Sequence, residues 1–388
     1  MAPRDSRSPA MGELPPLAAR RLPREFGAAR QTGGEDSPAR KANETGMKTW
    51  VLLAPGQLEL REVPDPEPGP QEAVVRVRAA GVCGSDVECY AGRHPLPNYP
   101  RVPGHELAGE VAAIGSSWQG PPAGARVAVD PALSCGSCYA CRHGRHNCCA
   151  NISIAGVHRP GAMAEYIVCQ ASQLHIIPEE MGFETAAVVE TLSIGAQAVR
   201  RGQVVSGDLV VVLGAGPIGL CCLMMAKQEG AKVLVAEPLA WRRAAAAELG
   251  ADACVDPQGE SLPEAVQSFT DGYGAHVVID ASGDLAAAQA SLSLVGAAGR
   301  VVILTISPAP MEVAPWELVQ RELTVLGSRL TLSDFRELIG LVRAGAMPIG
   351  RLVTHRFPMG EADQAHRAAC QRDEGVIKTI ILPQEAGA

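Results

Sequence analysis

Residues 209–219 read LVVVLGAGPIG, and this stretch decides the fold class of the chain. Five apolar and mostly β-branched residues predict a buried strand, and the glycines and the proline then predict a tight turn. The apolar run continues beyond the turn and predicts a helix over Pro217–Gln228. The uncharged residues from Leu209 to Ala226 approach the length of a membrane span, but the glycines and proline among them favour a strand, a turn and a helix.

The glycines of this stretch have the spacing G-x-G-x-x-G in the context that a dinucleotide site requires, after a strand and before a helix. Gly214 allows the tight turn, Gly216 lets a pyrophosphate approach the backbone, and Gly219 lets the helix pack on the strand. Pro217 and Ile218 complete the loop. Free N–H groups at the helix N-terminus would then bind the phosphates.

Glu237 ends the next predicted strand, Lys232–Ala236, at 18 residues beyond Gly219. A carboxylate at this point accepts hydrogen bonds from both ribose hydroxyls and repels a 2′-phosphate, so the sequence predicts NAD rather than NADP as the cofactor. Arg242 could flank the ribose. If Arg242 or Arg243 instead bound a 2′-phosphate, the cofactor would be NADP.

Strands and helices alternate from about residue 200 onward. A helix is predicted over Arg242–Leu249, and the later strands are His276–Asp280, Arg300–Leu304 and Leu323–Leu326. Strands that are separated by helices imply a parallel, doubly wound sheet. We therefore expect an α/β protein whose residues 199–334 form a Rossmann-type, NAD-binding domain.

The part of the chain before this domain has a different pattern, with short strands between Gly and Pro turns. The strand candidates are Lys48–Leu53, Val74–Ala79, Glu110–Ile114 and Arg126–Val129. They predict an antiparallel or barrel-like domain over residues 47–198. A helix over Phe335–Ala344 and a closing strand near Val376–Leu382 predict that residues 335–388 return to it.

Residues 1–46 contain six prolines, eight basic and six acidic residues without a hydrophobic period, so we expect a disordered extension. Its acidic residues argue against an organelle transit peptide. The net charge of −8 argues mildly against nucleic acid or an anionic membrane as a partner. Because no secretory signal is recognised, we expect a cytoplasmic protein whose twelve cysteines bind metal rather than form disulfides.

Four cysteines have a spacing that is typical of a zinc site. Cys135, Cys138, Cys141 and Cys149 follow the pattern C-x2-C-x2-C-x7-C, in which four thiolates can surround one zinc ion tetrahedrally. Cys148 is an alternative for the fourth position, although the pattern favours Cys149. Since the protein would supply all four ligands, this zinc should be structural and should hold a loop.

A second group of candidate ligands is dispersed along the chain. Cys83 lies in the stretch Gly81–Asp86, and His105 lies in Gly104–Glu106. Each stretch follows a predicted strand beside glycines, where side chains can converge on a cleft. One cysteine and one histidine are weak evidence by themselves, because a lone histidine is more often structural.

Over residues 47–382 these motifs resemble the medium-chain zinc alcohol dehydrogenases, and most of all the branch of sorbitol, threonine and other polyol or sugar-acid dehydrogenases. The resemblance implies a GroES-like antiparallel β catalytic domain beside the Rossmann domain, and two zinc ions per chain. It implies that Cys83 and His105 bind the catalytic zinc. Glu106 would be a further ligand, as in many polyol enzymes. The family's stretch E-P-L-S-V-G reads ETLSIG here, with Thr191 in place of proline, and its Glu190 would approach the metal directly or through water.

The resemblance also implies roles for the residues that follow Cys83. The metal would lower the pKa of the substrate hydroxyl, Ser85 would take its proton, and hydride would pass to the nicotinamide. Asp86 would hydrogen-bond the zinc-binding histidine and fix its tautomer. Many relatives carry a histidine where Glu88 stands, so Glu88 is a substitute relay or a surface charge, and the proton could also leave through water and the cofactor ribose. Tyr90 matches a substrate-pocket aromatic but could equally belong to the core.

Arg329 follows a predicted strand at a point where sorbitol-type relatives place an arginine that faces cofactor and substrate. It could pair with a substrate carboxylate, or it could be a surface arginine. We therefore predict an NAD-dependent oxidation of a secondary alcohol on a polyol, sugar acid or related small polar substrate, by a homodimer or homotetramer. A threonine or vicinal-diol dehydrogenase is the alternative within this class, and a non-catalytic zinc-binding protein of the same fold is the alternative outside it.

Overall fold

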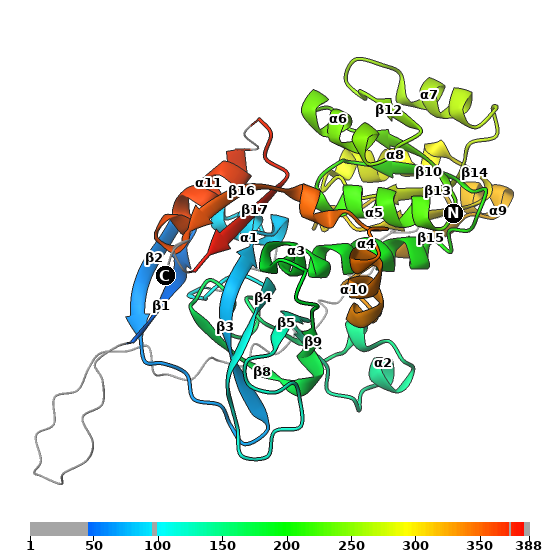
Figure 1. Cartoon of the computed structure of the whole chain (residues 1–388). Helices are drawn as coiled ribbons and strands as arrows, with labels where there is room; N and C mark the ends of the chain where they lie inside the picture. The colour runs from blue at the N-terminus through cyan, green and yellow to red at the C-terminus, as the bar shows by residue number, and fades with distance from the viewer. Residues whose placement is uncertain (1–45, 95–98, 372–373, 384–388) are drawn as a thin grey trace, which may run out of the picture. The chain divides into compact units, whose positions relative to one another are not determined.

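The computed structural model describes residues 46–94, 99–371 and 374–383. The disorder expected for residues 1–46 therefore concerns a segment outside the described residues, apart from Gly46. Two large sheets organise the described part of the chain (Figure 1). In these residues we find no helix with the length and apolar character needed to cross a membrane.

The first large sheet has six strands in the order β12-β11-β10-β13-β14-β15, and every pair in it is parallel. The strands are β10 (Leu209–Leu213), β11 (Lys232–Ala236), β12 (Ala253–Val255), β13 (Ala275–Asp280), β14 (Val295–Ile303) and β15 (Thr324–Gly327). The chain order reverses at β10, which is the arrangement of a Rossmann-type sheet with its ligand crevice at the carboxyl ends of the strands. The predicted doubly wound sheet is confirmed.

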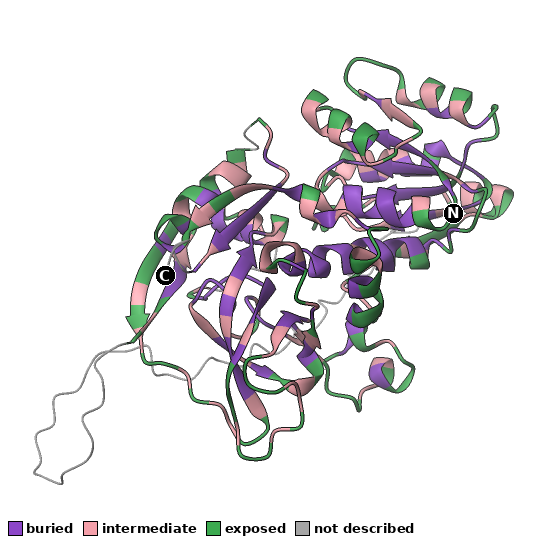
Figure 2. Cartoon of the chain, viewed as in Figure 1, coloured by how far each residue is buried: buried purple, intermediate pink, exposed green. Residues whose placement is uncertain are grey.

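The helices between these strands explain why β10 is apolar at every position. They are α5 (Pro217–Gln228), α6 (Ala240–Glu248), α7 (Leu262–Phe269), α8 (Leu285–Leu294) and α9 (Pro315–Arg321). Val210, Val211 and Val212 of β10 are fully buried, although successive side chains of a strand point to alternate faces of the sheet. In Figure 2 the strands of this sheet are largely coloured as buried. A parallel strand covered on both faces is apolar throughout rather than alternating.

The second large sheet has the order β16-β17-β3-β4-β5-β9, with β8 also paired to β3. Its strands are β3 (Glu72–Gly81), β4 (Glu106–Ile114), β5 (Arg126–Val129), β8 (Tyr166–Gln170), β9 (Leu174–Ile176), β16 (Val353–Pro358) and β17 (Lys378–Leu382). The pairs are antiparallel except for β16 and β17, which are parallel because the helix α11 (Ala362–Gln371) connects them as a crossover. Since β17 pairs with β3, the end of the chain does return to this sheet.

Two small sheets and several short helices complete this part. The pairs are β1 (Met47–Ala54) with β2 (Gln57–Val63), and β6 (Ala132–Leu133) with β7 (Ser153–Ile154). The cysteine-rich loop between β6 and β7 contains α2 (Tyr139–Arg142) and the 3-10 helix η1 (His146–Cys148). The helix α1 (Gly84–Tyr90) follows β3, and α10 (Phe335–Arg343) follows β15.

The helix α4 (Val189–Arg201) belongs to a core that residues of both large sheets share. Ala79 of β3 and Val210 of β10 lie in this same hydrophobic cluster. Gly195 allows α4 to approach α5 closely, because a Cβ there would come within 2.6 Å of the Cβ of Cys221. The helix runs through the expected domain boundary at residue 198, so that boundary stays a prediction.

Candidate metal centres and cofactor site

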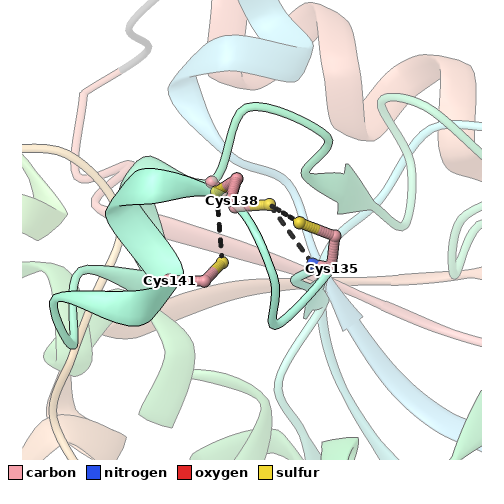
Figure 3. Close-up of side chains that lie close together, drawn as sticks. Cys135, Cys138 and Cys141 are labelled. Carbon is pink, nitrogen blue, oxygen red and sulfur yellow. Dashed lines mark hydrogen bonds between the residues drawn. The ribbon is translucent and has the colours of Figure 1, made fainter.

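The four cysteines of the predicted structural site lie together in one loop (Figure 3). The sulfur atoms of Cys135, Cys138, Cys141 and Cys149 all lie within 4.8 Å of one another. Cys148, the alternative fourth ligand, is exposed and stands outside this group. The structure therefore brings together the set of cysteines that the spacing favoured.

Backbone N–H groups of the same loop point at these sulfur atoms. The N–H of Cys135 donates to Cys149 Sγ at 3.2 Å. Hydrogen bonds from the N–H groups of Ser137 and Cys138 lower the pKa of the Cys135 thiol to about 5, whereas burial raises that of Cys141 to about 11. The thiolate is the form that binds metal, and four closely spaced thiols are the donor set of a structural zinc site. These residues fit a zinc ion.

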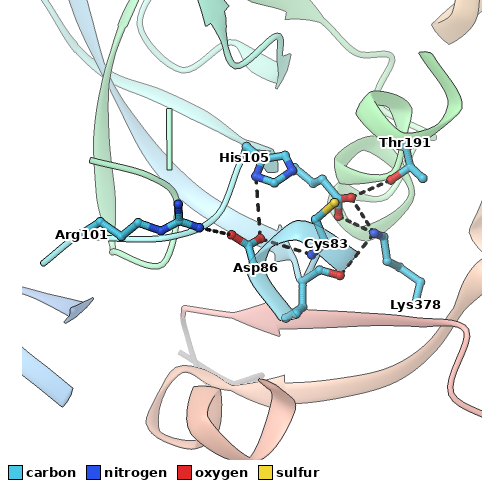
Figure 4. A network of polar contacts seen from close by, with 8 residues as sticks. Cys83, Asp86, Arg101, His105, Thr191 and Lys378 are labelled. Atoms are coloured by element: carbon cyan, nitrogen blue, oxygen red, sulfur yellow. Dashed lines mark hydrogen bonds and ion pairs between the residues drawn. The ribbon is translucent and has the colours of Figure 1, made fainter. Parts of the chain in front are cut away.

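The second candidate group is assembled from separate elements (Figure 4). Cys83 immediately precedes α1, His105 immediately precedes β4, and Glu106 opens β4, so His105 lies before a strand and not after one as predicted. One ligand atom from each of these three residues lies within 4.8 Å of the others. Gly104 makes the turn before His105 with a φ of +96°, a conformation that side chains other than glycine rarely adopt. A thiol, an imidazole and a carboxylate fit a zinc ion that keeps a position for substrate.

Asp86 of α1 lies behind the imidazole of His105. Its Oδ2 is 3.7 Å from His105 Nδ1, which is longer than a hydrogen bond, and its Oδ1 is 3.5 Å from Nη2 of Arg101. Among the described residues, His105 Nδ1 has no hydrogen-bond partner. Although burial opposes the charged form, Cys83 and Asp86 raise the pKa of His105 well above its ordinary value. Asp86 thus faces the imidazole of His105 as expected, but the predicted hydrogen bond between them is not formed.

Glu106 forms a buried ion pair that sequence analysis did not predict. Lys378 Nζ lies 2.6 Å from Glu106 Oε1 and 2.5 Å from Oε2, and it also donates to the carbonyl of Val82 at 3.4 Å. Thr191 Oγ1 donates to Oε1 at 3.0 Å. Lys378 is 2% exposed and Glu106 is 0% exposed, and a carboxylate so buried needs a counter-charge. The family's proline at position 191 is thus replaced by a residue that donates to the candidate ligand.

Glu190, the alternative ligand, lies in the first turn of α4 and is 6% exposed. It stands outside the group of three residues. Burial raises the pKa of its carboxyl to about 7, although nearby His105 acts to lower it. Glu190 is therefore a neighbour of the group and lines the space beside it.

Three further residues of α1 were assigned roles from the resemblance. Ser85 is half-buried at the start of the helix. Glu88 makes two hydrogen bonds to Arg93, at 2.7 and 3.0 Å, and its side chain is 42% exposed. The hydroxyl of Tyr90 donates to Asp363 at 2.8 Å, and its ring belongs to a hydrophobic core cluster. Glu88 is thus paired with Arg93 at the surface and Tyr90 packs in a core cluster, and their roles in the reaction stay predictions.

The glycine-rich loop joins β10 to α5. Gly214 has a φ of +93°, and a Cβ on Gly219 would collide with the carbonyl oxygen of Gly214. Gly216 precedes the helix, and Pro217 and Ile218 are its first two residues. The backbone therefore follows the course that the motif predicts, with open N–H groups at the helix N-terminus.

Glu237 follows β11 and is 4% exposed. Its Oε2 accepts a hydrogen bond from the N–H of Ala215 in the glycine-rich loop at 2.8 Å, and its Oε1 accepts one from Leu239 N–H at 3.0 Å. Arg243 donates to the Glu237 carbonyl at 2.7 Å and pairs with Asp256 at 3.2 Å. Two backbone contacts thus hold the carboxylate beside the loop, and Arg243 is engaged elsewhere.

Two arginines complete the predicted cofactor site. Arg242 of α6 stacks on Trp241 with its guanidinium carbon 4.8 Å from the ring centroid, and it reaches toward Gly216. Arg329 follows β15 and its side chain is exposed. The carbonyl of Arg329 accepts a hydrogen bond from Asn147 Nδ2 of the cysteine-rich loop at 2.8 Å. Sequence analysis did not single out Asn147, because only the cysteines of this loop form a recognisable pattern.

Family models and a curated relative match most of the chain. The model of the alcohol dehydrogenase GroES-like domain matches residues 69–179, and the model of the zinc-binding dehydrogenase matches residues 217–344. The L-galactonate-5-dehydrogenase of Escherichia coli strain K12 is 33% identical over 337 residues, covering 86% of this chain and 98% of that protein. The chain belongs to the zinc-dependent alcohol dehydrogenase family. The resemblance found in the sequence is confirmed.

Solved structures of this family extend over the same part of the chain. A zinc-binding dehydrogenase of Sinorhizobium meliloti 1021, bound to NADP, has a TM-score of 0.83 and 34% identity, covering 88% of this chain and 100% of its own. An alcohol dehydrogenase of Escherichia coli CFT073, in complex with NADH, has a TM-score of 0.82 and 32% identity, covering 87% and 99%. The predicted combination of a GroES-like and a Rossmann-type fold is thereby confirmed. The two cofactors differ, so family membership leaves NAD and NADP open.

Proposed function

We propose that this zinc-dependent dehydrogenase transfers hydride reversibly between NAD and a secondary alcohol of a polyol, a sugar acid or a related small polar substrate. The observation that carries the proposal is the group of Cys83, His105 and Glu106, which is assembled from separate elements and supplies three ligands, one fewer than a tetrahedral zinc ion takes. We assign residues 47–198 with 335–388 to metal and substrate, and residues 199–334 to the cofactor.

Cys83 and His105, with Glu106 or Glu190, would hold the catalytic metal. A zinc ion bound there lowers the pKa of a substrate hydroxyl and stabilises negative charge on its oxygen. Asp86 faces His105 Nδ1 and leaves Nε2 for the metal, so it orients the ring as metal-site carboxylates do. Ser85, half-buried at the start of α1, accepts the hydroxyl proton. Because Glu88 is tied to Arg93, we propose that the proton continues through water and the cofactor ribose.

Lys378 is a positioning residue for the same reaction. A thiolate from Cys83 and a carboxylate from Glu106 together cancel the two charges of a zinc ion. The ammonium of Lys378, 2.6 Å from Glu106 Oε1, restores one positive charge to the buried site. A more positive site favours loss of the hydroxyl proton from the substrate. Lys378 and Thr191 also fix the rotamer of Glu106.

The environment of Glu237 favours NAD as the cofactor. Its carboxylate is held beside the glycine-rich loop by two backbone N–H groups, where it would accept hydrogen bonds from the ribose hydroxyls. Arg243 is engaged with Asp256, so the cation best placed to bind a 2′-phosphate is already paired. Arg242, which reaches toward Gly216, would flank the ribose.

The test is an activity screen of the purified protein with its zinc content measured. Polyols, sugar acids, L-threonine and vicinal diols are each offered with NAD or NADP, and the absorbance of the reduced cofactor is followed. Turnover of a polyol or sugar acid with NAD supports the proposal. Turnover of threonine or a simple diol alone would favour the alternative enzyme, and a single zinc ion without any turnover would favour a non-catalytic protein.

We also propose that the protein is a homodimer or homotetramer. The strand β15 forms an edge of the parallel sheet, and its Val325 is 41% exposed. On the neighbouring helix α9, Trp316 is 63% and Val319 is 80% exposed. An open strand edge beside exposed apolar side chains is typical of an interface. Light scattering of the wild type and of Val319→Lys would test it, with a smaller species expected for the variant.

A further inference from the structure

A cavity of about 240 Å³ adjoins the catalytic group at Glu190. Its walls come from segments far apart in the chain: Glu190 and Ser193 of α4, Asp130 after β5, Asn147 of the cysteine-rich loop, and Thr331 and Phe335 near α10. Its volume is close to the lower limit of small-molecule pockets, roughly 300 Å³. The cysteine-rich loop therefore contributes to a space that is also lined by Glu190, a neighbour of the Cys83 group.

Asn147 brings an unsatisfied polar atom to this cavity. The side chain is 4% exposed, and its Nδ2 donates to the carbonyl oxygen of Arg329 at 2.8 Å. A carbonyl can only accept, so this contact identifies the other amide atom of Asn147 as the oxygen Oδ1. Within the described part of the chain, Oδ1 has no hydrogen-bond partner. A buried acceptor without a donor is unfavourable unless a ligand or water supplies one.

The cavity has two carboxyl groups, those of Asp130 and Glu190, beside side chains that can donate as well as accept: Ser134, His146, Gln170, Ser172, Ser193 and Thr331. Asp130 Oδ1 accepts the N–H of Ala132 at 2.9 Å, and burial raises the pKa of this carboxyl. Among the described residues, no lysine or arginine lines the cavity. The two carboxyl groups and the unsatisfied Asn147 oxygen favour a group that donates hydrogen bonds.

We propose that this cavity is a subsite that binds a hydroxyl group of the substrate beyond the reacting carbon, with Asn147 Oδ1 and the Asp130 carboxylate as the acceptors. The inference rests on the proposed function, since it takes the reacting alcohol to lie at the Cys83 group. It gives the cysteine-rich loop a part in substrate selection.

The test compares two probes that differ in hydroxyl groups, sorbitol and butane-2,3-diol, on the zinc-loaded protein with NADH bound. Dissociation constants come from the change in NADH fluorescence, and kcat/KM is measured in parallel with NAD. The wild type should bind sorbitol more tightly than the diol. Asn147→Ala should weaken sorbitol binding about tenfold, the effect of one lost hydrogen bond, while diol binding changes less than about twofold.

A second variant separates the subsite from a purely structural role of Asn147. Asn147→Asp keeps an acceptor oxygen but loses the donor to Arg329, so it should retain the preference for sorbitol. Ser172→Ala, at the exposed rim of the same cavity, is the matched control and should leave both constants unchanged. Equal binding of the two probes by the wild type, or equal losses for both probes in Asn147→Ala and Asn147→Asp, would overturn the subsite. Absence of turnover with normal selective binding would count against the proposed function alone.

Discussion

The two groups of candidate zinc ligands are built in opposite ways. All four thiols of the first lie within residues 135–149, in one loop whose own N–H groups point at the sulfur atoms. The second group joins Cys83 to His105 and Glu106, and it relies on Lys378, which lies 272 residues beyond Glu106. A local group needs only its loop to form, whereas a dispersed group forms only when the whole sheet is in place.

The same difference separates a zinc site that stabilises the structure from a zinc site that takes part in catalysis. Four cysteines complete the coordination of a zinc ion and leave no position for a substrate. Three mixed ligands leave a position open, and burial with a counter-charge makes their electrostatics sensitive to each neighbour. Substitutions at the two zinc sites should therefore lower the activity of the protein to different extents.

The largest expected effect is that of Cys83→Ser. This variant should keep its fold and its NAD binding and lose one of two zinc ions. Its kcat/KM should fall about a thousandfold or more, because the metal lowers the activation barrier by several kcal/mol. Zinc analysis and steady-state kinetics measure both. The matched variant Cys138→Ser should lose the other zinc ion and retain most of the activity of its folded fraction. A similar loss of kcat/KM in the two variants would contradict separate roles for the two zinc ions.

Lys378→Met should produce the next largest effect, in stability. It leaves the Glu106 carboxylate buried without its counter-ion, which costs about 3–5 kcal/mol. Urea denaturation of the zinc-free protein, in which no metal ion compensates Glu106, measures the free energy of unfolding. Lys227→Met is the control, because Lys227 and Asp252 form a comparable pair, 2.7 Å apart, with side chains 31% and 32% exposed. That change should cost less than about 1 kcal/mol, and equal costs would show that the Glu106 pair is not buried in solution.

In the zinc-free protein, the ionisation of Glu190 should make the free energy of unfolding depend on pH. Burial raises the pKa of this carboxyl to about 7 in the folded state, above its ordinary 4.5 in the unfolded state. The stabilisation is then complete below pH 4.5 and is lost as the pH rises through about 7. It amounts to about 3 kcal/mol. Glu190→Gln should remove this slope and the exposed Glu229→Gln should keep it, whereas parallel profiles for the wild type and Glu190→Gln would refute the assignment.

Glu237→Ala should have the smallest effect, and it lies in neither metal group. Loss of the ribose acceptor should weaken NAD binding about tenfold. It should also lower the ratio of kcat/KM for NAD over NADP, while both zinc ions stay bound. An unchanged ratio would mean that Glu237 does not contact the ribose.

Regions with local determinants were predictable from the sequence. The predicted β10, α5 and β11 match the structure residue for residue, because buried parallel strands are apolar throughout and the glycines mark the turn between them. The cysteine-rich loop was predictable for a similar reason, since its spacing lies within one loop. Of the antiparallel strands, β1, β3, β4 and β5 were predicted, with limits that differ by a few residues at β3 and β4, whereas β2 and β6 to β9 were not predicted.

Features that depend on distant partners escaped sequence analysis. Lys378 opens an otherwise uncharged strand, but nothing local shows that it meets Glu106. Thr191 attracted attention only as a departure from a family motif, and Asn147 not at all. The one visible signal was the lone lysine in the strand Lys378–Leu382. Because most side chains of this strand are buried, the lysine needs a buried carboxylate from another part of the chain.

The central claim is that Cys83 and His105 share one metal ion, distinct from the ion in the cysteine-rich loop. Anomalous diffraction at the zinc absorption edge, on crystals of the purified protein, tests this most directly. We predict two peaks per chain, one among the four cysteines and one about 2.3 Å from the sulfur of Cys83 and about 2.0 Å from a nitrogen of His105. A single peak, confined to residues 135–149, would contradict the account.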